Sequence, residues 1–469
     1  MTFIPPLNQI AFSVVDLRLT ERWFREGFGL LPAGGSRWKM RGLMAARVQG
    51  LPRAASTCWW LVGRNPWFQL ELFQFERPIA ELMPRDSRPC DIGYTRIGLW
   101  VADFDATLAR LKTLGSLPLS APLGAPGKRR ACVRNPDGVF VEIMEDDPLA
   151  TVAAPGRSNC PAAIRSVTMS VPDLTKTALF LSTGVGIKES DVTLHTPEHE
   201  ALWGLAGART LSKVFLAGDV LVEAVQYLDP VGRPRRQGYR INDQGILNIA
   251  FGARTKKDHV TVYRRSRDAG ARPNCSPLYM PGFGAGVVYV NDPQNFSVEI
   301  LWLNPGRPDR DWGFDPLPIQ QRPEPDTLSV SQRVTLHAPV ERVWAVVTDH
   351  EGMAQWIGFK PVTRTVDGTP DVNGYGSVRL MHGPAGKVVE QVIDCNPLQS
   401  LRYRVIKGSP LVCHQGEVRL TPVGSNTELT WTIRFRPKIA GTGFLLRPFM
   451  QRMLGAMVDK HLKSYVERR

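Results

Sequence analysis

Two stretches of the chain, residues 68–75 and 220–227, share a pattern of apolar positions around a single glutamate. Each stretch predicts a β-strand, with Glu71 in the first and Glu223 in the second. Another apolar strand follows each one after a proline and a basic segment, and it carries Arg96 in the first copy and Asn248 in the second. The spacing is 96 − 71 = 25 residues in one copy and 248 − 223 = 25 residues in the other. Equal spacing of similar elements predicts an internal repeat.

The remaining elements of each copy follow the same alternation. Residues 7–14 alternate apolar and polar, which predicts a half-buried strand, and Asp16 is placed to cap a helix over residues 17–28. Asp173 has the same place in the second copy. Each copy ends in a turn and a strand, over residues 139–145 and 296–302. The pattern predicts two domains, residues 1–148 and 164–305, joined by a linker over residues 149–163.

The pattern changes after a second linker over residues 306–326, which is rich in proline and arginine and is expected to be extended. A strand over residues 330–336, a helix over residues 339–348 and several strands between residues 378 and 432 come before a long helix over residues 446–466. This order predicts a domain over residues 327–469 whose antiparallel sheet wraps around the last helix. The whole chain is therefore expected to be α+β.

Composition places the chain among globular proteins. Its 469 residues predict about three domains. The seven cysteines are scattered and never spaced as Cys-x-x-Cys, which argues against a zinc site or a disulfide framework and indicates a cytoplasmic location. No apolar run approaches the length of a membrane span, and the N-terminus lacks the pattern of a signal peptide, so no membrane partner is expected.

The formal charge of +14 is spread along the chain and comes mostly from arginine. Nucleic-acid-binding proteins usually concentrate their basic residues in runs or on one face, so no nucleic-acid partner is expected. General solubility explains a dispersed charge, and an anionic ligand such as a carboxylate or a coenzyme A thioester comes next, because arginine suits such groups. We therefore expect a small-molecule substrate that is hydrophobic and anionic. The oligomeric state is left open, a homodimer included.

The repeat resembles the vicinal oxygen chelate superfamily, which includes glyoxalases, extradiol dioxygenases, epimerases and bleomycin-binding proteins. The resemblance covers residues 1–305 and is carried by the first strand and helix cap of each copy, by the glutamate strands and by the closing strands. It implies two tandem βαβββ domains. Metalloenzymes of this superfamily hold a divalent ion with His and Glu. The positions that match those ligands here are Gln9, Glu71, Arg96 and Glu142 in the first copy and Ser166, Glu223, Asn248 and Glu299 in the second.

These residues depart from the family's ligand set. No histidine occurs before His195, so the first copy has no imidazole, and Arg96 adds a cation among its carboxylates. Glutamates with Ser and Asn suit a hard ion such as Mg²⁺ in the second copy better than a transition metal. We therefore expect no metal and no other cofactor. A metal-dependent dioxygenase or epimerase is kept as an alternative.

Strand parity groups six side chains of the first copy on one face of a cleft. They are Gln9, Glu71, Arg96, Trp100, Phe140 and Glu142. The guanidinium can replace the metal and hold a substrate carboxylate or enolate, with a glutamate as base. The alternative is a buried Arg–Glu cluster that closes the cleft and has no catalytic role. His195 and His199 flank Pro197, which predicts a loop, and both are expected at the surface.

The last domain resembles the polyketide cyclase/dehydrase proteins of the START-like (SRPBCC) superfamily, on residues 338–344, 388–391, 401–404 and 429–431. The resemblance implies a helix-grip fold. Strand parity predicts that the arginines of these strands, Arg379 among them, face solvent, while five other side chains point into the core. The five are His382, Glu390, Tyr403, His414 and Trp431. His and Glu can act as acid and base and Tyr can donate to an oxyanion. The alternative is a lipid-type pocket whose polar groups only orient a ligand.

The favoured interpretation is a metal-independent acid–base enzyme, namely a cyclase, dehydratase or isomerase that acts next to the carbonyl of a polyketide, a polycyclic ketone or an acyl thioester. The predicted catalytic residues are His382, Glu390, Tyr403 and His414, with Glu71, Arg96 and Glu142. The predicted substrate-binding residues are Trp431, Trp100, Phe140, Gln9, Ser166, Glu223, Asn248 and Glu299. The main alternative is a protein that binds or sequesters a small molecule without converting it.

Overall fold

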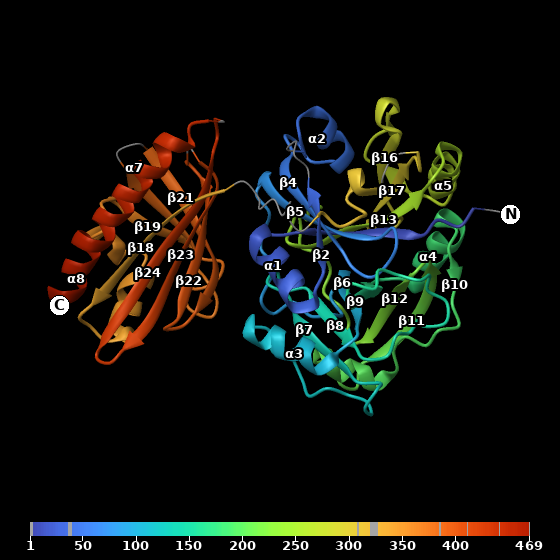
Figure 1. The fold of residues 1–469 in the computed structure, drawn as a ribbon, viewed down its shortest axis with the longest axis horizontal. Coiled ribbons are helices and arrows are strands. Elements are labelled where there is room, and N and C mark those ends of the chain that lie inside the picture. Colours follow the sequence, from blue (N-terminus) through green and yellow to red (C-terminus); the bar gives the residue numbers. More distant parts are fainter. Residues whose placement is uncertain are drawn as a thin grey trace. The chain divides into compact units, whose positions relative to one another are not determined.

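The computed structural model describes residues 3–35, 40–306, 309–318, 327–383, 386–409, 411–439 and 441–468. The chain divides into two compact units, Met1–Pro323 and Glu324–Arg469, and each unit combines helices with strands (Figure 1). The predicted α+β class is confirmed. The second unit begins close to residue 327, where the third domain was predicted to begin.

Sheet A of the first unit joins the first half of one copy to the second half of the other. Its strand order is β14-β16-β17-β13-β1-β5-β4-β2, with β15 beside β16 and β3 beside β4. The strands from the first copy are β1 (Leu7–Ser13), β2 (Leu31–Gly35), β3 (Met40–Arg41), β4 (Ala55–Val62) and β5 (Gln69–Arg77). Those from the second copy are β13 (Gly245–Ala253), β14 (Arg272–Pro273), β15 (Leu278–Met280), β16 (Ala285–Asn291) and β17 (Ser297–Leu303).

Sheet B takes the two remaining halves, in the order β10-β11-β12-β9-β6-β8-β7. Its strands are β6 (Gly93–Val101), β7 (Arg130–Arg134), β8 (Phe140–Met144), β9 (Ala162–Ser170), β10 (Lys188–Glu189), β11 (Arg209–Ala217) and β12 (Val220–Asp229). The halves meet as antiparallel pairs, β1 with β13 in sheet A and β6 with β9 in sheet B. The two copies therefore exchange halves, which the division into residues 1–148 and 164–305 did not anticipate.

Two helices of the first unit, α1 (Leu17–Phe28) and α4 (Leu174–Leu179), begin where the sequence placed their caps. The other helices of this unit are α2 (Leu43–Gln49), α3 (Phe104–Thr113) and α5 (Lys256–Asp268), with short turns η1 (Phe180–Val185), η2 (Pro197–Trp203), η3 (Pro281–Phe283) and η4 (Asp309–Trp312). The Asp16 carboxylate accepts the Leu19 N–H at 3.3 Å, and the Asp173 carboxylate accepts the Lys176 N–H at 3.0 Å. The predicted caps are confirmed because each satisfies a backbone N–H that has no partner within its helix.

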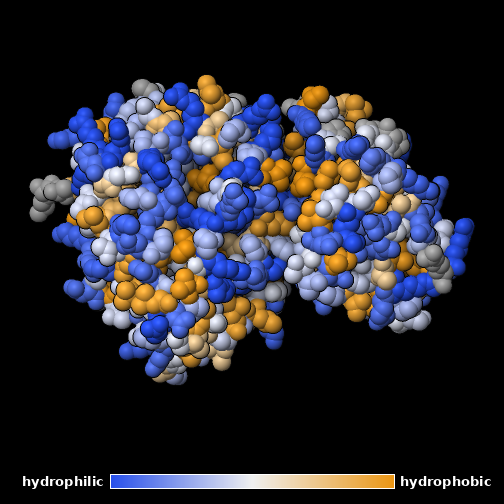
Figure 2. All heavy atoms as spheres, turned by 180° about the vertical axis from the view of Figure 1, so that it is seen from behind, coloured by the Kyte–Doolittle hydropathy of each residue, from blue (hydrophilic) through white to orange (hydrophobic). Residues whose placement is uncertain are grey.

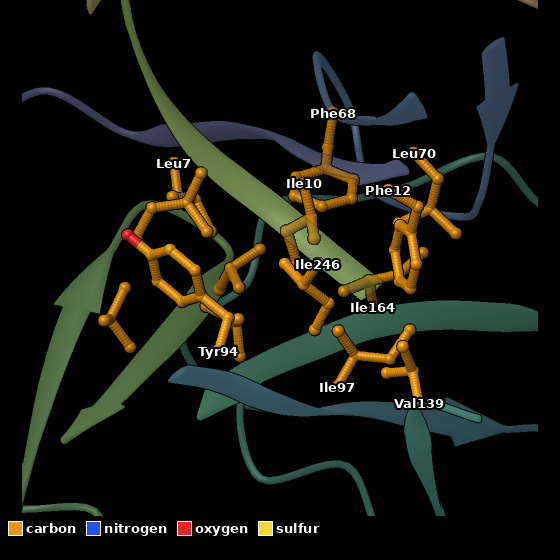
Figure 3. Close-up of a cluster of buried hydrophobic side chains, with 14 of the residues drawn as sticks. Leu7, Ile10, Phe12, Phe68, Leu70, Tyr94, Ile97, Val139, Ile164 and Ile246 are labelled. Carbon is orange, nitrogen blue, oxygen red and sulfur yellow. The ribbon is translucent and has the colours of Figure 1, made fainter. Parts of the chain in front are cut away.

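Sheets A and B share one hydrophobic core, to which α1, α3 and α5 also contribute. Ile10 and Phe12 of β1 lie in it with Ile97 of β6 and Ile164 of β9 (Figure 3). Side chains alternate along a strand, so the neighbours of these residues face away from the core. That second face of each sheet carries the polar positions singled out in the sequence, and we call the two sites cleft A and cleft B.

Part of the predicted linker belongs to the first unit. Residues 309–312 form η4, and Phe314 is fully buried in a cluster with Ala285 and Leu303. The Phe314 ring lies 5.9 Å from that of Trp67. The prediction of an extended chain is therefore wrong here, because an apolar side chain of the segment is buried against sheet A.

The second unit contains sheet C, in the order β18-β24-β23-β22-β21-β20-β19, with every neighbouring pair antiparallel. Its strands are β18 (Leu328–Leu336), β19 (Val362–Val366), β20 (Val378–Gly383), β21 (Gly386–Asn396), β22 (Ser400–Lys407), β23 (Leu411–Val423) and β24 (Asn426–Pro437). Its helices are α6 (Val340–Thr348), η6 (Gly352–Gln355), α7 (Gly443–Gly455), η7 (Ala456–Leu462) and α8 (Lys463–Arg468). Figure 1 shows the long C-terminal helix lying along this sheet, as predicted.

Candidate functional site

The eight positions matched to a metal-ligand set regroup across the two copies. Cleft A holds Gln9 of β1, Glu71 of β5, Asn248 of β13 and Glu299 of β17. Cleft B holds Arg96 of β6, Glu142 of β8, Ser166 of β9 and Glu223 of β12. The prediction that each copy builds its own cleft is wrong, because the strands of each cleft come from both copies.

A glycine lets the polar side chains of cleft B approach one another. Gly98 lies opposite Ser166 on β9 and beside Glu142 on β8. A Cβ atom at Gly98 would lie 2.3 Å from Ser166 Oγ, closer than such atoms pack. Any larger residue at this position would displace the cluster.

His195 completes cleft B by bridging the two carboxylates. Its Nε2 lies 2.7 Å from Glu142 Oε2 and its Nδ1 lies 2.7 Å from Glu223 Oε1. Arg96 Nη2 donates to Glu223 Oε2 at 3.0 Å, and Arg130 Nη1 donates to Glu142 Oε1 at 3.0 Å. The His195 side chain is only 6% exposed, so the prediction of a surface histidine is wrong. The second copy supplies the imidazole that the first copy lacks.

The pairing keeps this cluster fully charged. Burial by itself lowers the pKa of His195, but Glu142 and Glu223 outweigh it and raise the pKa to about 9. Burial raises the pKa of both glutamates, yet His195 outweighs it and holds the pKa of Glu142 well below its usual range and that of Glu223 at about 2. An imidazolium and two guanidinium groups therefore surround two carboxylates.

Trp203 of η2 covers cleft B. Its ring lies 3.7 Å from the Arg96 guanidinium and 5.2 Å from the His195 ring. Phe140 packs beside Trp203, whereas the Trp100 indole donates to the Glu145 carbonyl at 3.2 Å. Cations stand between the carboxylates where a metal ion would be, so cleft B does not fit a metal. This geometry favours the closed Arg–Glu cluster over a substrate-holding guanidinium.

Cleft A has the opposite electrostatics. Glu71 Oε1 accepts hydrogen bonds from Cys58 Sγ at 2.9 Å and Trp60 Nε1 at 3.0 Å. Within the described ranges, neither Glu71 nor Glu299 forms an ion pair. Burial raises the pKa of Glu71 to about 7, and burial together with the Glu71 charge raises that of Glu299 to about 8. Two acidic groups therefore share a site without a compensating cation.

Several buried oxygen atoms of cleft A have no hydrogen-bond partner among the described residues. They are Gln9 Oε1, Asn248 Oδ1 and Glu299 Oε2. Buried acceptors normally find a donor or a cation. Carboxylate and amide oxygens without an imidazole suit a hard divalent ion such as Mg²⁺ or Ca²⁺, so the donors of cleft A fit one. In the part of the chain that the structure describes, no group of three or more His, Cys, Asp or Glu could hold a metal, so the amides would be needed.

The segment after β17 lies against cleft A. Gln69 Nε2 donates to the Trp312 carbonyl at 3.3 Å. Gly313 follows with φ +75°, and a Cβ atom there would lie 2.4 Å from the Trp60 ring and 2.8 Å from Gln69 Oε1. Both the conformation and the close approach require glycine. Cleft A thus has a covering segment of its own, as cleft B has η2.

The second unit buries three of its five predicted inward residues as a connected group. Glu390, Tyr403 and Trp431 are 6%, 4% and 2% exposed. Trp431 Nε1 donates to the Tyr403 hydroxyl at 3.1 Å. Gly416 lies opposite Tyr403 on the neighbouring strand, and a Cβ atom there would lie 2.0 Å from the Tyr403 ring. Glycine at this position makes room for the phenol in the interior.

Arg379 joins this group, although the sequence placed it in solvent. It is 2% exposed, and its Nε and Nη2 lie 2.8 and 2.6 Å from Glu390 Oε2. Its guanidinium carbon lies 5.1 Å from the Tyr403 ring. The inward residues of β20 are therefore Arg379 and Met381, and His382 falls on the other face, opposite Lys387. The prediction that His382 points inward is wrong. A buried carboxylate needs a cation partner, so the inward Glu390 already indicated that an arginine on a neighbouring strand points inward.

The ring nitrogens of two histidines of the second unit are buried without partners among the described residues. Both ring nitrogens of His414 and of His350 lack a hydrogen bond among the described residues, as does Trp356 Nε1. Burial lowers the pKa of His414, and burial with the Arg379 charge lowers that of His350 to about 2. The Trp356 ring lies 6.2 Å from that of Trp431. Buried polar atoms without partners indicate an interior that takes a polar ligand or water. The sequence analysis missed His350 and Trp356, which lie outside the strands.

Comparisons with known proteins give one family match and several solved structures to which the chain is similar. Residues 327–468 match the model of the polyketide cyclase/dehydrase and lipid transport family. Glyoxalase I from Zea mays is 16% identical, with 63% of this chain and 92% of that chain covered and a TM-score of 0.43. An aromatase/cyclase from Streptomyces sp. R1128 is 24% identical over 30% of this chain and 95% of that chain, with a TM-score of 0.25. A START superfamily protein from Mycobacterium smegmatis is 17% identical over 30% and 97%, with a TM-score of 0.28.

A search of curated proteins finds no match. The family match supports a cyclase-like role or the binding of a small molecule for the second unit.

Proposed function

We propose that the second unit binds a bulky apolar molecule through a carbonyl group and catalyses acid–base chemistry next to that carbonyl. Cyclisation, dehydration and isomerisation are the reactions that such chemistry covers. The observation that carries the proposal is the buried His414 imidazole, whose two nitrogens have no partner among the described residues. It lies on the strand beside that of Tyr403, in a unit whose interior also holds the Arg379–Glu390 ion pair.

His414 is suited to take a proton from the substrate. Burial lowers its pKa, so the imidazole is neutral at pH 7 and one ring nitrogen has a free lone pair. Tyr403 is suited to the opposite role. Burial raises its pKa, so the phenol keeps its proton, and Trp431 donates to its oxygen and leaves the O–H free to donate. A neutral base and a phenol donor are the two groups that enolisation next to a carbonyl requires.

Arg379 and Glu390 act as a pair in this proposal. The Glu390 carboxylate accepts two donors of Arg379, which makes it a holder of the cation rather than a free base. Arg379 supplies a fixed positive charge beside the Tyr403 ring, where negative charge on a substrate oxygen would develop. We therefore assign the role of catalytic base to His414 and not to Glu390. Glu390 is a positioning residue that holds Arg379 in place.

His414→Gln and Tyr403→Phe test the proposal, with His382→Gln as the matched control on the other face of the sheet. Turnover of polycyclic ketones and acyl thioesters should fall about 10²-fold in the first two variants and stay unchanged in the third. Binding is followed separately through the change in tryptophan fluorescence that Trp356→Phe and Trp431→Phe remove. If the wild-type protein binds these compounds but does not convert them, it is a sequestering protein instead. Equal turnover in all variants would refute the catalytic role.

A second candidate function concerns cleft A. The unpartnered oxygens and the two uncompensated carboxylates favour a site for a hard divalent cation held by Gln9, Glu71, Asn248 and Glu299. Such an ion would polarise a substrate carbonyl. Glu71 receives hydrogen bonds from Cys58 and Trp60, which fix one carboxylate in the cleft.

Calorimetric titration with MgCl₂, CaCl₂ and ZnCl₂ tests this second candidate without an activity assay. We expect one hard ion to bind, with a rise in the unfolding midpoint at pH 8 that Glu299→Gln abolishes. Glu189→Gln, an exposed glutamate of sheet B, is the control. Preferential binding of Zn²⁺, or no binding of any ion, would contradict the assignment.

A further inference from the structure

The outward face of α7 exposes large apolar side chains. Phe444 is 75% exposed, Leu445 and Phe449 are each 62% exposed, and Met453 is 40% exposed. Leu445, Phe449 and Met453 recur every four residues, so they form one stripe along the helix. Ile439, just before the helix, is 70% exposed and extends this surface. We call these five residues the apolar face of α7.

This face is not needed to hold the helix on its sheet. Met450 and Leu454 point the other way, are 5% and 0% exposed, and belong to the core of the second unit. Figure 2 shows one face of the molecule, on which hydrophilic side chains are mixed with hydrophobic ones. Clustered exposed aromatic and aliphatic side chains usually mark an interaction site.

The charged residues in the segment that carries the apolar face are of one sign. Residues 436–458 contain Arg436, Lys438, Arg447 and Arg452 and no aspartate or glutamate. Arg447 and Arg452 lie on α7, between the exposed apolar positions, and both are exposed. A helix with aromatic and aliphatic side chains on one face and basic residues beside them is typical of binding to the interface of an anionic membrane.

We propose that the apolar face of α7 docks on the surface of an anionic lipid membrane. Phe444, Leu445 and Phe449 would enter the boundary between headgroups and acyl chains, while Arg447 and Arg452 contact lipid phosphates. A second copy of the chain is a poorer occupant, because a two-fold contact would bring the basic residues of both copies together. No helix in the described part of the chain is long and apolar enough to cross a membrane, so the contact is peripheral. This inference differs from the expectation of no membrane partner, which rested on the lack of an apolar run long enough to span a membrane.

Vesicle flotation of the full chain tests the proposal. We expect binding to vesicles of phosphatidylcholine mixed with phosphatidylglycerol, little binding to phosphatidylcholine alone, and weaker binding at high salt. The double variant Phe444→Ser, Phe449→Ser should lower vesicle binding at least about tenfold. The double variant Arg447→Gln, Arg452→Gln should lose the preference for the anionic vesicles.

The matched control is Val366→Ser with Val423→Ser, which removes two exposed apolar side chains of sheet C, 51% and 53% exposed. It should bind vesicles as the wild type does. Circular dichroism and the unfolding midpoint establish that each variant is folded. Equal binding by the wild type and the Phe444→Ser, Phe449→Ser variant would overturn the proposal. The proposal would also be overturned if the wild-type protein is a dimer that does not bind vesicles and the Phe444→Ser, Phe449→Ser variant is a monomer. The apolar face of α7 would then join two copies of the chain.

Discussion

Clefts A and B occupy the same strand positions of two related sheets and yet hold opposite charge states. In both clefts the two glutamates lie on strands that are separated by two other strands of the sheet. In cleft B, His195, Arg96 and Arg130 neutralise them, whereas in cleft A the position of Arg96 is taken by Asn248 and no cation contacts the glutamates among the described residues. The comparison teaches that the strands fix where the carboxylates lie, while two strand arginines, Arg96 and Arg130, and one loop histidine, His195, decide whether the carboxylates are neutralised.

Removal of the Arg96 charge is the change with the largest expected effect. Arg96→Met would leave Glu223 buried with a weakened set of partners, and we expect the free energy of unfolding to fall by about 3–5 kcal/mol. Urea unfolding of the full chain measures this loss. Arg22→Met, which breaks an exposed ion pair with Glu26, should cost less than about 1 kcal/mol. A small effect of Arg96→Met would mean that cleft B does not depend on its cations.

The glutamates of the two clefts should make the free energy of unfolding depend on pH in opposite directions, which is the second largest expected effect. The pKa values of Glu71 and Glu299 are raised to about 7 and 8, so their contribution is complete below their unfolded pKa near 4.5 and is lost as pH rises through 8. In cleft B, Glu223 has a lowered pKa of about 2, so its contribution is complete above about pH 4.5 and is lost as pH falls through 2. His195 of the same cleft has a raised pKa of about 9, so its contribution is complete below about pH 6.5 and is lost as pH rises through 9.

The free energy of unfolding at pH 5 and at pH 8, without divalent ions, tests this difference. Cleft A should destabilise the protein by an amount on the order of 3 kcal/mol over this interval. Glu299→Gln should remove most of that loss, because it abolishes both the titration and the repulsion of Glu71. A wild-type protein with equal stability at both pH values would show that cleft A carries no such strain.

Two hydroxyls of cleft B give the smallest expected effects. Thr168 Oγ1 donates to Glu223 Oε2 at 2.8 Å, whereas Ser166 Oγ has no hydrogen-bond partner among the described residues. Thr168→Val should lower the free energy of unfolding by about 1.5–3 kcal/mol, and Ser166→Ala should change it by less than about 0.5 kcal/mol. Chemical unfolding of the two variants measures the difference. Equal losses would indicate that the hydroxyl of Ser166 has a partner, such as a water molecule.

The sequence by itself determined the elements of this protein and the faces of most strands. Apolar alternation placed β1, and helical spacing of apolar residues placed the long C-terminal helix. Asp16 and Asp173 marked two helix starts, and the resemblance to the vicinal oxygen chelate superfamily named the residues of the two ligand-like sets. These features are local, because a strand face or a helix cap depends on residues within a few positions.

The tertiary structure alone decided which halves pair and which loops close the clefts. β1 pairs with β13 and β6 with β9 through backbone hydrogen bonds that carry no side-chain signature, so the sequence could not assign Glu71 and Glu299 to one cleft. His195 reaches cleft B from a segment without periodicity. The alternation of side chains along β20 was assigned to the wrong faces of the sheet. In the sequence, an arginine that is buried in an ion pair with Glu390 cannot be told from a solvent-exposed arginine until its partner is known. Pairing between distant strands and charge compensation are long-range choices, and they fixed the chemistry of each site.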